Sequence, residues 1–271
     1  MRTLAMRTTA RFAAVVMCVG AIAAATTPAV AQRGGGPPGP PPSPRAAAPI
    51  DLTGVWVSIV NEDWRWRMVT PPAKDYASVQ ALMTEEARKL ADTWTPSQDG
   101  SCQAYGVAGL MRMPTRLRIA WENDATLVID TDAGQQTRRL LFDRNTPAPA
   151  VKSLQGFSLA EWERFTGGRG GPVPVVGGVP AAGGVRPASG SLKVVTTNVS
   201  GGWLRRNGVP YSDRTTLTEF FDRFPAGADE WLVVTTIVND PRYLNQEFVT
   251  SSHFRREPDA TRWAPAPCKP S

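Results

Sequence analysis

Apolar and polar side chains alternate along much of the chain after residue 50. A period of two residues is typical of a strand that buries one face. The pattern predicts strands over residues 52–60, 64–69, 115–121, 126–131, 136–142, 192–199, 215–224, 231–239 and 248–256. Turn compositions separate the three strands between residues 115 and 142, so we expect these strands to form a meander.

Helix signals are scarce. The best candidate covers Thr84–Thr93, because Thr84 can cap the first backbone N–H groups and two glutamates follow it at the positive end of the helix dipole. Many short strands with few helices are typical of an antiparallel barrel or sandwich. We therefore predict a mainly β fold, a closed antiparallel barrel or a barrel-like sandwich, with one short helix.

The N-terminus has the order of a secretory signal peptide. Three arginines precede an apolar run, and Ala29-Val30-Ala31 provides a cleavage site, which predicts a signal peptide over residues 1–31. Without its three arginines the chain has 27 basic and 24 acidic residues, a net charge of +3. This scattered charge does not indicate nucleic-acid binding. No later stretch has the roughly 20 apolar residues of a membrane span, so we expect a soluble periplasmic or secreted protein without a membrane anchor.

Composition divides the remaining chain. Residues 32–49 are rich in proline and glycine and predict a disordered linker. Residues 50–271 are expected to form a single β domain, interrupted by a disordered Gly/Pro-rich insertion at about 167–190.

Two cysteines, Cys102 and Cys268, remain after the signal peptide. In an oxidising compartment they predict one disulfide that ties the C-terminal tail to the first half of the domain. The alternative is two unpaired thiols.

The first predicted strand carries Gly54-Val55-Trp56, and a Gly-x-Trp at this position resembles the start of lipocalin-like barrels. The resemblance implies that Trp56 closes one end of the barrel. It also implies that an arginine of a late strand, Arg255 or Arg256, stacks on the indole ring.

A wider resemblance covers most of the chain after the signal peptide. It rests on the motifs Cys102-x-x-Tyr105-Gly106, Gly156-Phe157-Ser158 with Trp162-Glu163, Gly208-x-Pro210-x-Ser212, Thr218-Glu219 and Asp240-Pro241. In this order they are similar to an uncharacterised family of secreted bacterial β proteins. The resemblance implies secretion and a β fold and brings no reaction. The chain departs from it at Phe157, where the family often has histidine, and in the Gly/Pro-rich insertion.

Glu219 is the most informative carboxylate, because alternation places it between Leu217 and Phe221 on an apolar strand face. A carboxylate in such surroundings pairs with a cation or acts as a ligand-orienting or acid/base group. One interpretation is an ion pair with Arg223 or Arg118 that plugs the barrel. The other makes Glu219 part of a binding or catalytic site.

His253 is the only histidine, so it and Glu219 are the catalytic candidates. A single imidazole cannot build a histidine-rich metal site, and we expect neither a metal nor a cofactor, although ligation of a heme by His253 alone stays open. Ser158 either pairs with His253 as a hydrolase nucleophile or caps a short helical segment over residues 159–164.

Nine tryptophans are many for this length, and Trp64-Arg65-Trp66-Arg67 is the densest group. In an extended segment, Trp64 and Trp66 share one face. They either pack in the core or form an aromatic wall for a flat or sugar-like ligand, to which other aromatic residues can add.

These features favour a periplasmic or secreted binding protein for a small hydrophobic or aromatic molecule. The expected ligand-binding residues are Trp56, Trp64, Trp66, Tyr105, Trp121, Tyr211 and Glu219, with His253 near them. One alternative is a metal-independent lyase, isomerase or hydrolase that uses Glu219 or His253 on the same barrel. Another is an envelope interaction protein, which predicts a filled barrel and an exposed apolar patch.

Overall fold

The computed structural model describes residues 40–164 and 190–270. The predicted signal peptide, the first part of the predicted linker and the predicted insertion up to residue 189 lie outside the described residues. The elements below all belong to the compact unit formed by residues 41–271.

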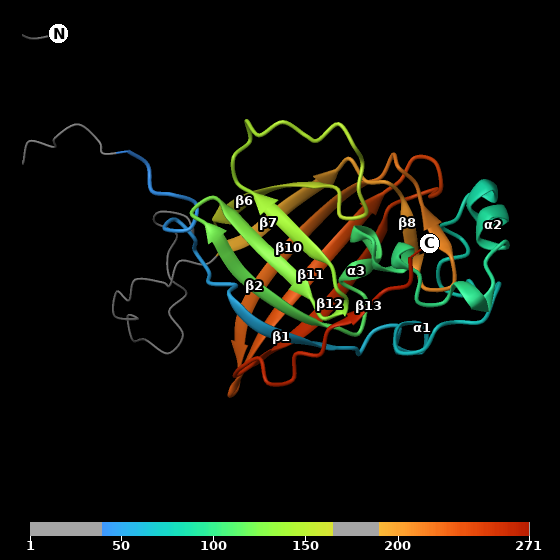
Figure 1. The fold of residues 1–271 in the computed structure, drawn as a ribbon, viewed down its shortest axis with the longest axis horizontal. Coiled ribbons are helices and arrows are strands. Elements are labelled where there is room, and N and C mark those ends of the chain that lie inside the picture. Colours follow the sequence, from blue (N-terminus) through green and yellow to red (C-terminus); the bar gives the residue numbers. More distant parts are fainter. Residues whose placement is uncertain (1–39, 165–189, 271) are drawn as a thin grey trace, which may run out of the picture. The chain divides into compact units, whose positions relative to one another are not determined.

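A closed β-barrel forms the centre of this unit (Figure 1). In the described chain it has nine strands: β1 (Gly54–Ile59), β2 (Arg116–Asn123), β3 (Thr126–Thr131), β5 (Thr137–Leu141), β6 (Phe157–Arg164), β7 (Gly190–Thr197), β10 (Thr216–Ala226), β11 (Asp229–Asn239) and β12 (Phe248–Glu257). Their order around the barrel is β1-β12-β11-β10-β7-β6-β5-β3-β2, and β2 closes the barrel on β1. Neighbouring strands are antiparallel except β5 and β6, which pair in parallel. The predicted mainly β barrel and its meander, β2-β3-β5, are confirmed.

Alternation fills the barrel with side chains. On β10 the inward residues are Leu217, Glu219 and Phe221, and the outward residues between them are partly exposed. All nine strands contribute apolar side chains to the same main core, and the smallest of these is Ala160 on β6. A packed interior of this kind is the main source of the barrel's stability.

Trp56 belongs to the main core and is completely buried. Its Nε1 donates to the carbonyl of Leu52 at 3.0 Å, and the guanidinium of Arg256 lies over its ring at 5.6 Å. The stacking of a late-strand arginine expected from the Gly-x-Trp motif is therefore present, with Arg256 as the arginine. Gly54 has a φ of 127°, and a Cβ there would lie 3.2 Å from Arg256.

Short elements gather at one end of the barrel, where Figure 1 shows α2, α3 and β8. They are α2 (Glu85–Ala91), two 3-10 turns η1 (Pro96–Gln98) and η2 (Cys102–Tyr105), α3 (Val107–Leu110), and the hairpin of β8 (Gly202–Arg205) and β9 (Val209–Tyr211). A second apolar core joins them to the ends of β10, β11 and β12. The predicted helix is confirmed as α2, and Thr84 accepts a hydrogen bond from the backbone N–H of Ala87 as its N-cap.

The predicted disulfide between Cys102 and Cys268 is present. It joins η2 to the C-terminal segment, which also pairs through β13 (Ala266–Pro267) with β4 (Ala133–Gly134). The backbone N–H of Cys102 donates to the carbonyl of Lys269 at 2.9 Å. The tail is therefore fixed along the barrel by covalent and backbone bonds.

Two predicted elements are wrong. Residues 64–67 form α1 (Trp64–Arg67), a single helical turn, where a strand was expected. Its buried residue is Arg67, so the four-residue alternation of tryptophan and arginine does not mark a buried strand face. Ser158 and residues 159–164 belong to strand β6, where a capped helical segment was expected.

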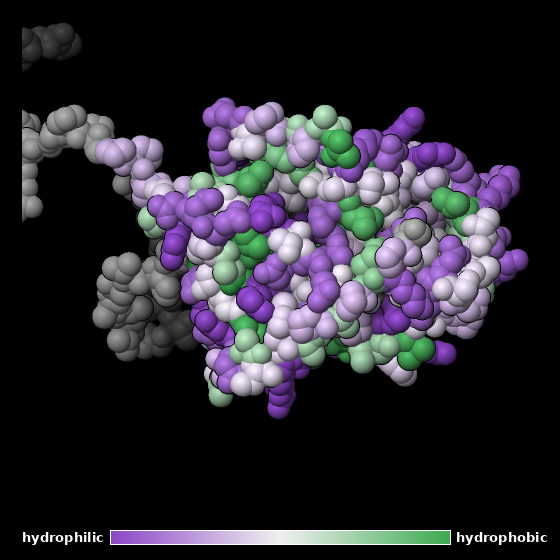
Figure 2. All heavy atoms as spheres, viewed as in Figure 1, coloured by the Kyte–Doolittle hydropathy of each residue, from purple (hydrophilic) through white to green (hydrophobic). Residues whose placement is uncertain are grey.

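Residues at the end of the predicted linker contact the barrel. The carbonyl of Pro44 accepts a hydrogen bond from Trp162 Nε1 at 2.9 Å, and the backbone N–H of Arg45 donates to the carbonyl of Asp124 at 3.0 Å. Hydrophilic residues cover most of the face in Figure 2, with hydrophobic residues scattered among them. Within the described ranges, no helix has the length and apolar character needed to cross a membrane.

Candidate functional site

Glu219 lies inside the barrel as half of a fully buried ion pair. Arg138 of β5 binds it through both terminal nitrogens, at 3.1 Å from Nη1 to Oε1. A buried ion pair is what one interpretation of the sequence expected, but both expected partners were wrong. Arg223 lies at the end of the strand and binds a carboxylate at the rim, and Arg118 is exposed on β2 and stacks on Trp263 at 4.3 Å.

His253 and Glu219 lie on opposite faces of the barrel wall. The even-numbered residues from Phe248 to Phe254 on β12 are buried, so His253 faces outward and is half-buried. Ser158 faces inward, where its hydroxyl lies 2.8 Å from Thr196 Oγ1. The structure thus brings His253 together with neither Glu219 nor Ser158.

The predicted aromatic residues are spread over separate places. Trp56 is part of the main core, and Trp121 packs at its edge on two aromatic rings 5.4 and 6.5 Å away. Trp64 and Trp66 lie on α1 outside the barrel, with Trp64 60% exposed. Tyr105 packs over β4, and burial raises the pKa of its hydroxyl. These residues do not form a common lumen site.

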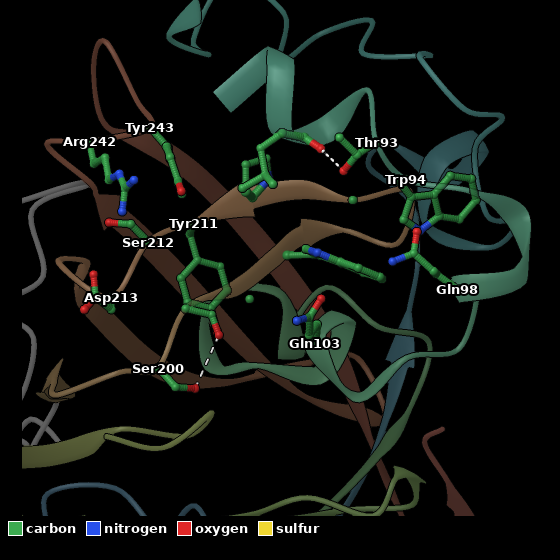
Figure 3. Close-up of a pocket in the computed structure, with 16 residues that line it drawn as sticks. Thr93, Trp94, Gln98, Gln103, Ser200, Tyr211, Ser212, Asp213, Arg242 and Tyr243 are labelled. Carbon is green, nitrogen blue, oxygen red and sulfur yellow. Dashed lines mark hydrogen bonds between the residues drawn. The ribbon is translucent and has the colours of Figure 1, made fainter. Parts of the chain in front are cut away.

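A cleft of about 400 Å³ opens outside the barrel, at the end that carries the short elements (Figure 3). Its walls come from the C-terminal end of α2, from η1 and η2, from the β8–β9 hairpin and from the loop between β11 and β12. Tyr211 is the one member of the predicted ligand-binding set among the described residues that line it. A concave site of this size is typical of small-molecule binding.

Aromatic rings form the apolar part of the cleft. Trp94 and Trp203 are 5% and 8% exposed, and Tyr211 is buried beside them. Two glycines allow this packing, since a Cβ on Gly208 would lie 2.6 Å from Trp94 and a Cβ on Gly202 would lie 2.7 Å from the Tyr211 hydroxyl. Burial raises the pKa of Tyr211, so its hydroxyl stays protonated.

Polar side chains flank these rings. In Figure 3, Gln98 lies on the same side as Trp94, and Asp213 and Arg242 lie on the opposite side. A hydrogen bond from Lys152 Nζ at 2.7 Å lowers the pKa of Asp213, which is therefore ionised at neutral pH. The cleft thus offers an amide, a carboxylate and a guanidinium around an aromatic surface.

Asp240 holds one rim of the cleft in place through hydrogen bonds to rim residues. It is buried and accepts hydrogen bonds from the backbone N–H and hydroxyl of Ser212, the latter at 2.8 Å. It also accepts from the hydroxyl of Thr215 and from the backbone N–H groups of Arg242 and Tyr243. One buried carboxylate therefore fixes three cleft-lining residues, which pre-organises the rim.

Trp94 contributes a donor without a partner. Its Nε1 is buried and makes no hydrogen bond to any part of the chain that the structure describes. A buried indole N–H normally finds an acceptor, because leaving it unpaired costs about 1–3 kcal/mol. Since Trp94 lines the cleft, an oxygen of a ligand or a water can supply this acceptor.

Motifs that carried the wider resemblance meet at this cleft. Gly208, Pro210 and Ser212 line it, Asp240 supports its rim, and Gly106 packs against the Tyr211 hydroxyl. These segments are far apart in the chain. The sequence contains these motifs, but only the fold shows that they lie together at one cleft.

Comparison of the chain with models of known families, with characterised proteins and with solved structures finds no significant match. Among the described residues, no group of three or more His, Cys, Asp and Glu side chains is arranged to hold a metal ion.

Proposed function

We propose that this protein is a periplasmic or secreted binding protein whose ligand occupies the cleft over the β8–β9 hairpin. The observation that carries the proposal is the combination of buried aromatic rings with polar groups on both sides of one concave surface. A few placed polar groups around an apolar surface are how small-molecule sites fix orientation.

The polar groups indicate the class of ligand. A hydrophobic or aromatic molecule, the class expected from the sequence, would leave the Gln103 amide and the amide nitrogen of Gln98 without hydrogen-bond partners, since only the Gln98 oxygen is paired, with the Thr95 backbone N–H. A ring-shaped molecule with several hydroxyl groups satisfies both requirements, because its face packs on an indole and its hydroxyls pair with amide, carboxylate and guanidinium groups. We therefore propose a mono- or disaccharide.

The location rests on the N-terminal sequence and on the disulfide, which is typical of oxidising compartments. Fractionation of cells and the mass of the protein test it. The expected result is a periplasmic or secreted product that begins at Gln32, and an unprocessed cytoplasmic product would contradict the proposal.

Native mass spectrometry of the processed protein, followed by titration with a panel of neutral and N-acetylated mono- and disaccharides, tests the ligand. Binding should change tryptophan fluorescence, and Trp203→Phe and Arg242→Ala should weaken it at least tenfold. Arg255→Ala is the matched control, because Arg255 is an exposed arginine outside the cleft. Equal affinity in all variants, or no binding by any sugar, would refute the proposal.

A second candidate function, an envelope interaction protein, is favoured by the exposed apolar side chains at α1. Trp64, Met68 and Val69 are 60%, 53% and 66% exposed, and the barrel interior is packed with side chains. A photo-crosslinker placed at residue 64 in cells should give one discrete adduct, which Met68→Ser reduces. The same crosslinker at exposed Val151 is the control, and indistinguishable adduct patterns would refute this function.

The enzymatic alternative has no comparable support. The distinguishing feature of this alternative is that Glu219 and His253 face one cavity, and the two residues lie on opposite sides of the barrel wall.

A further inference from the structure

Three buried arginines meet beside α1, and none of them lines the cleft proposed to bind a saccharide. Arg67 of α1, Arg112 after α3 and Arg205 of β8 are 2%, 5% and 3% exposed. Arg67 Nε donates to the carbonyl of Arg112 at 2.8 Å. Arg112 and Arg205 both approach one carboxylate oxygen of Asp63, at 2.9 and 4.0 Å. The cluster therefore joins three distant segments of the chain.

Positive charge in this cluster exceeds the negative charge that faces it. Asp63, which is partly exposed, lies within ion-pair distance of Arg112 and Arg205, and no carboxylate of the described chain lies within that distance of Arg67. Of the neighbouring acidic residues, Glu62 offers Arg67 its backbone carbonyl, and Asp75 accepts from the indole of Trp66. Arg206, a fourth arginine at the edge, pairs with Asp99 at 3.4 Å. Buried charges without counter-charges are strongly unfavourable.

The electrostatics agree with this imbalance. Burial and, after it, the charge of Arg112 lower the pKa of Arg67 from 12.5 to about 10. The same two causes lower the pKa of Arg205 to about 10. A nearby anion would oppose both effects.

Two donors in the cluster are unpaired. Arg67 Nη2 and Arg205 Nε are buried and make no hydrogen bond to the described residues. Both arginines line a small crevice, together with Arg112 and the ring of Trp66, over which Arg205 stacks at 5.1 Å. The crevice has a volume of about 10 Å³, which is space for one small occupant such as a water or a single ion.

We propose that this crevice binds a single chloride ion. A monatomic anion accepts hydrogen bonds from both unpaired donors and supplies the negative charge that the three arginines lack. Phosphate and sulfate have several heavy atoms and exceed the space. A water fits but brings no charge. The ion would fasten α1 and the β8–β9 hairpin to the end of the barrel.

Bromide replaces chloride at such sites and is located by its anomalous scattering. Crystals grown in sodium bromide should show an anomalous peak within hydrogen-bond distance of Arg67 Nη2 and Arg205 Nε. Crystals without a peak in the crevice would overturn the proposal. This measurement uses the natural protein, so it does not depend on a variant that folds.

Thermal unfolding tests the site in solution. Any salt screens the repulsion among the arginines, so chloride must be compared with gluconate and acetate at equal ionic strength. Relative to gluconate at equal ionic strength, chloride or bromide should raise the melting temperature by about 3–5 °C at a concentration tenfold above the dissociation constant, and the rise should continue with the logarithm of the halide concentration. An equal rise in gluconate, or in acetate, would overturn a monatomic anion site.

Variants separate the crevice from the rest of the surface. Arg205→Gln should abolish the difference between chloride and gluconate, while Arg255→Gln, which removes the same charge from an exposed side chain, should keep it. Loss of the difference in both variants, or in neither, would refute the role of the crevice.

Discussion

The buried ion pair inside the barrel allows a quantitative test of how the core is built. Glu219 and Arg138 are both completely buried at their side chains, and two hydrogen bonds join them. The perturbations are Glu219→Leu, Arg138→Met and the double variant, which replaces both charges with apolar side chains of similar length.

The expected magnitudes follow from desolvation. Removing one partner leaves the other charge buried and unpaired, which costs about 3–5 kcal/mol of unfolding free energy. Replacing both removes the desolvation cost together with the attraction, so the double variant should lose less than either single variant. For a domain of this size, the single losses correspond to a fall of about 6–20 °C in melting temperature. Glu219→Leu should be the costlier single change, because arginine keeps its charge.

Urea unfolding followed by far-ultraviolet circular dichroism gives the four free energies of the double-mutant cycle. The exposed pair of Arg139 on β5 and Glu122 on β2, joined at 3.1 Å, provides the matched control, since Arg139 is the neighbour of Arg138 in the chain. Arg139→Met with Glu122→Leu should change stability by no more than about 1 kcal/mol. Additive losses of Glu219 and Arg138, without coupling, would refute the reasoning.

Three further predictions concern other parts of the fold. Replacing both Cys102 and Cys268 by serine should cost about 2–5 kcal/mol in chemical unfolding, because the cross-link spans 166 residues, and unchanged stability would contradict it. Gly208→Ala should cost at least about 1 kcal/mol more than Gly227→Ala, because both residues have positive φ but only the first would press a Cβ against an indole. Equal losses on thermal unfolding would show that the contact is unimportant. Hydrogen bonds from two arginines lower the pKa of Glu230, so its contribution to stability is present above pH 4.5 and is lost as pH falls through the lowered value. The melting temperature of Glu230→Gln should therefore approach that of the natural protein in acid, and a difference that stays constant with pH would contradict this.

The barrel was predictable from the sequence because most of its strands bury one face. Along most of β10, β11 and β12, buried residues alternate with more exposed ones, and the observed strands agree with the predicted ones within a few residues. The N-cap of α2 was equally readable, since Thr84 and the residues after it form a local signal. These features depend on neighbours in the chain.

Strand β6 was missed because two of its inward residues, Ser158 and Ala160, are small. Ser158 and Ala160 face the interior near the Arg138 side chain, which itself binds Thr196, the neighbour of Ser158. Space taken up by a long charged pair leaves no room for large apolar residues opposite it. The partner of Glu219 was missed for a different reason. A charged strand residue such as Arg138 is ordinarily expected to face solvent.

The cleft forms where several loops meet, and no local sequence pattern predicts it. Thr84, which caps α2, also donates its backbone N–H to the carbonyl of Tyr243 at 3.0 Å, and its hydroxyl donates to the carbonyl of Arg242 at 3.1 Å. Asp240 holds the same two residues from the other side. The helix and the rim are thus fixed to one another through backbone groups, so the chain itself holds the walls of the cleft in place. For the proposed saccharide, rigid walls reduce the entropy cost of binding.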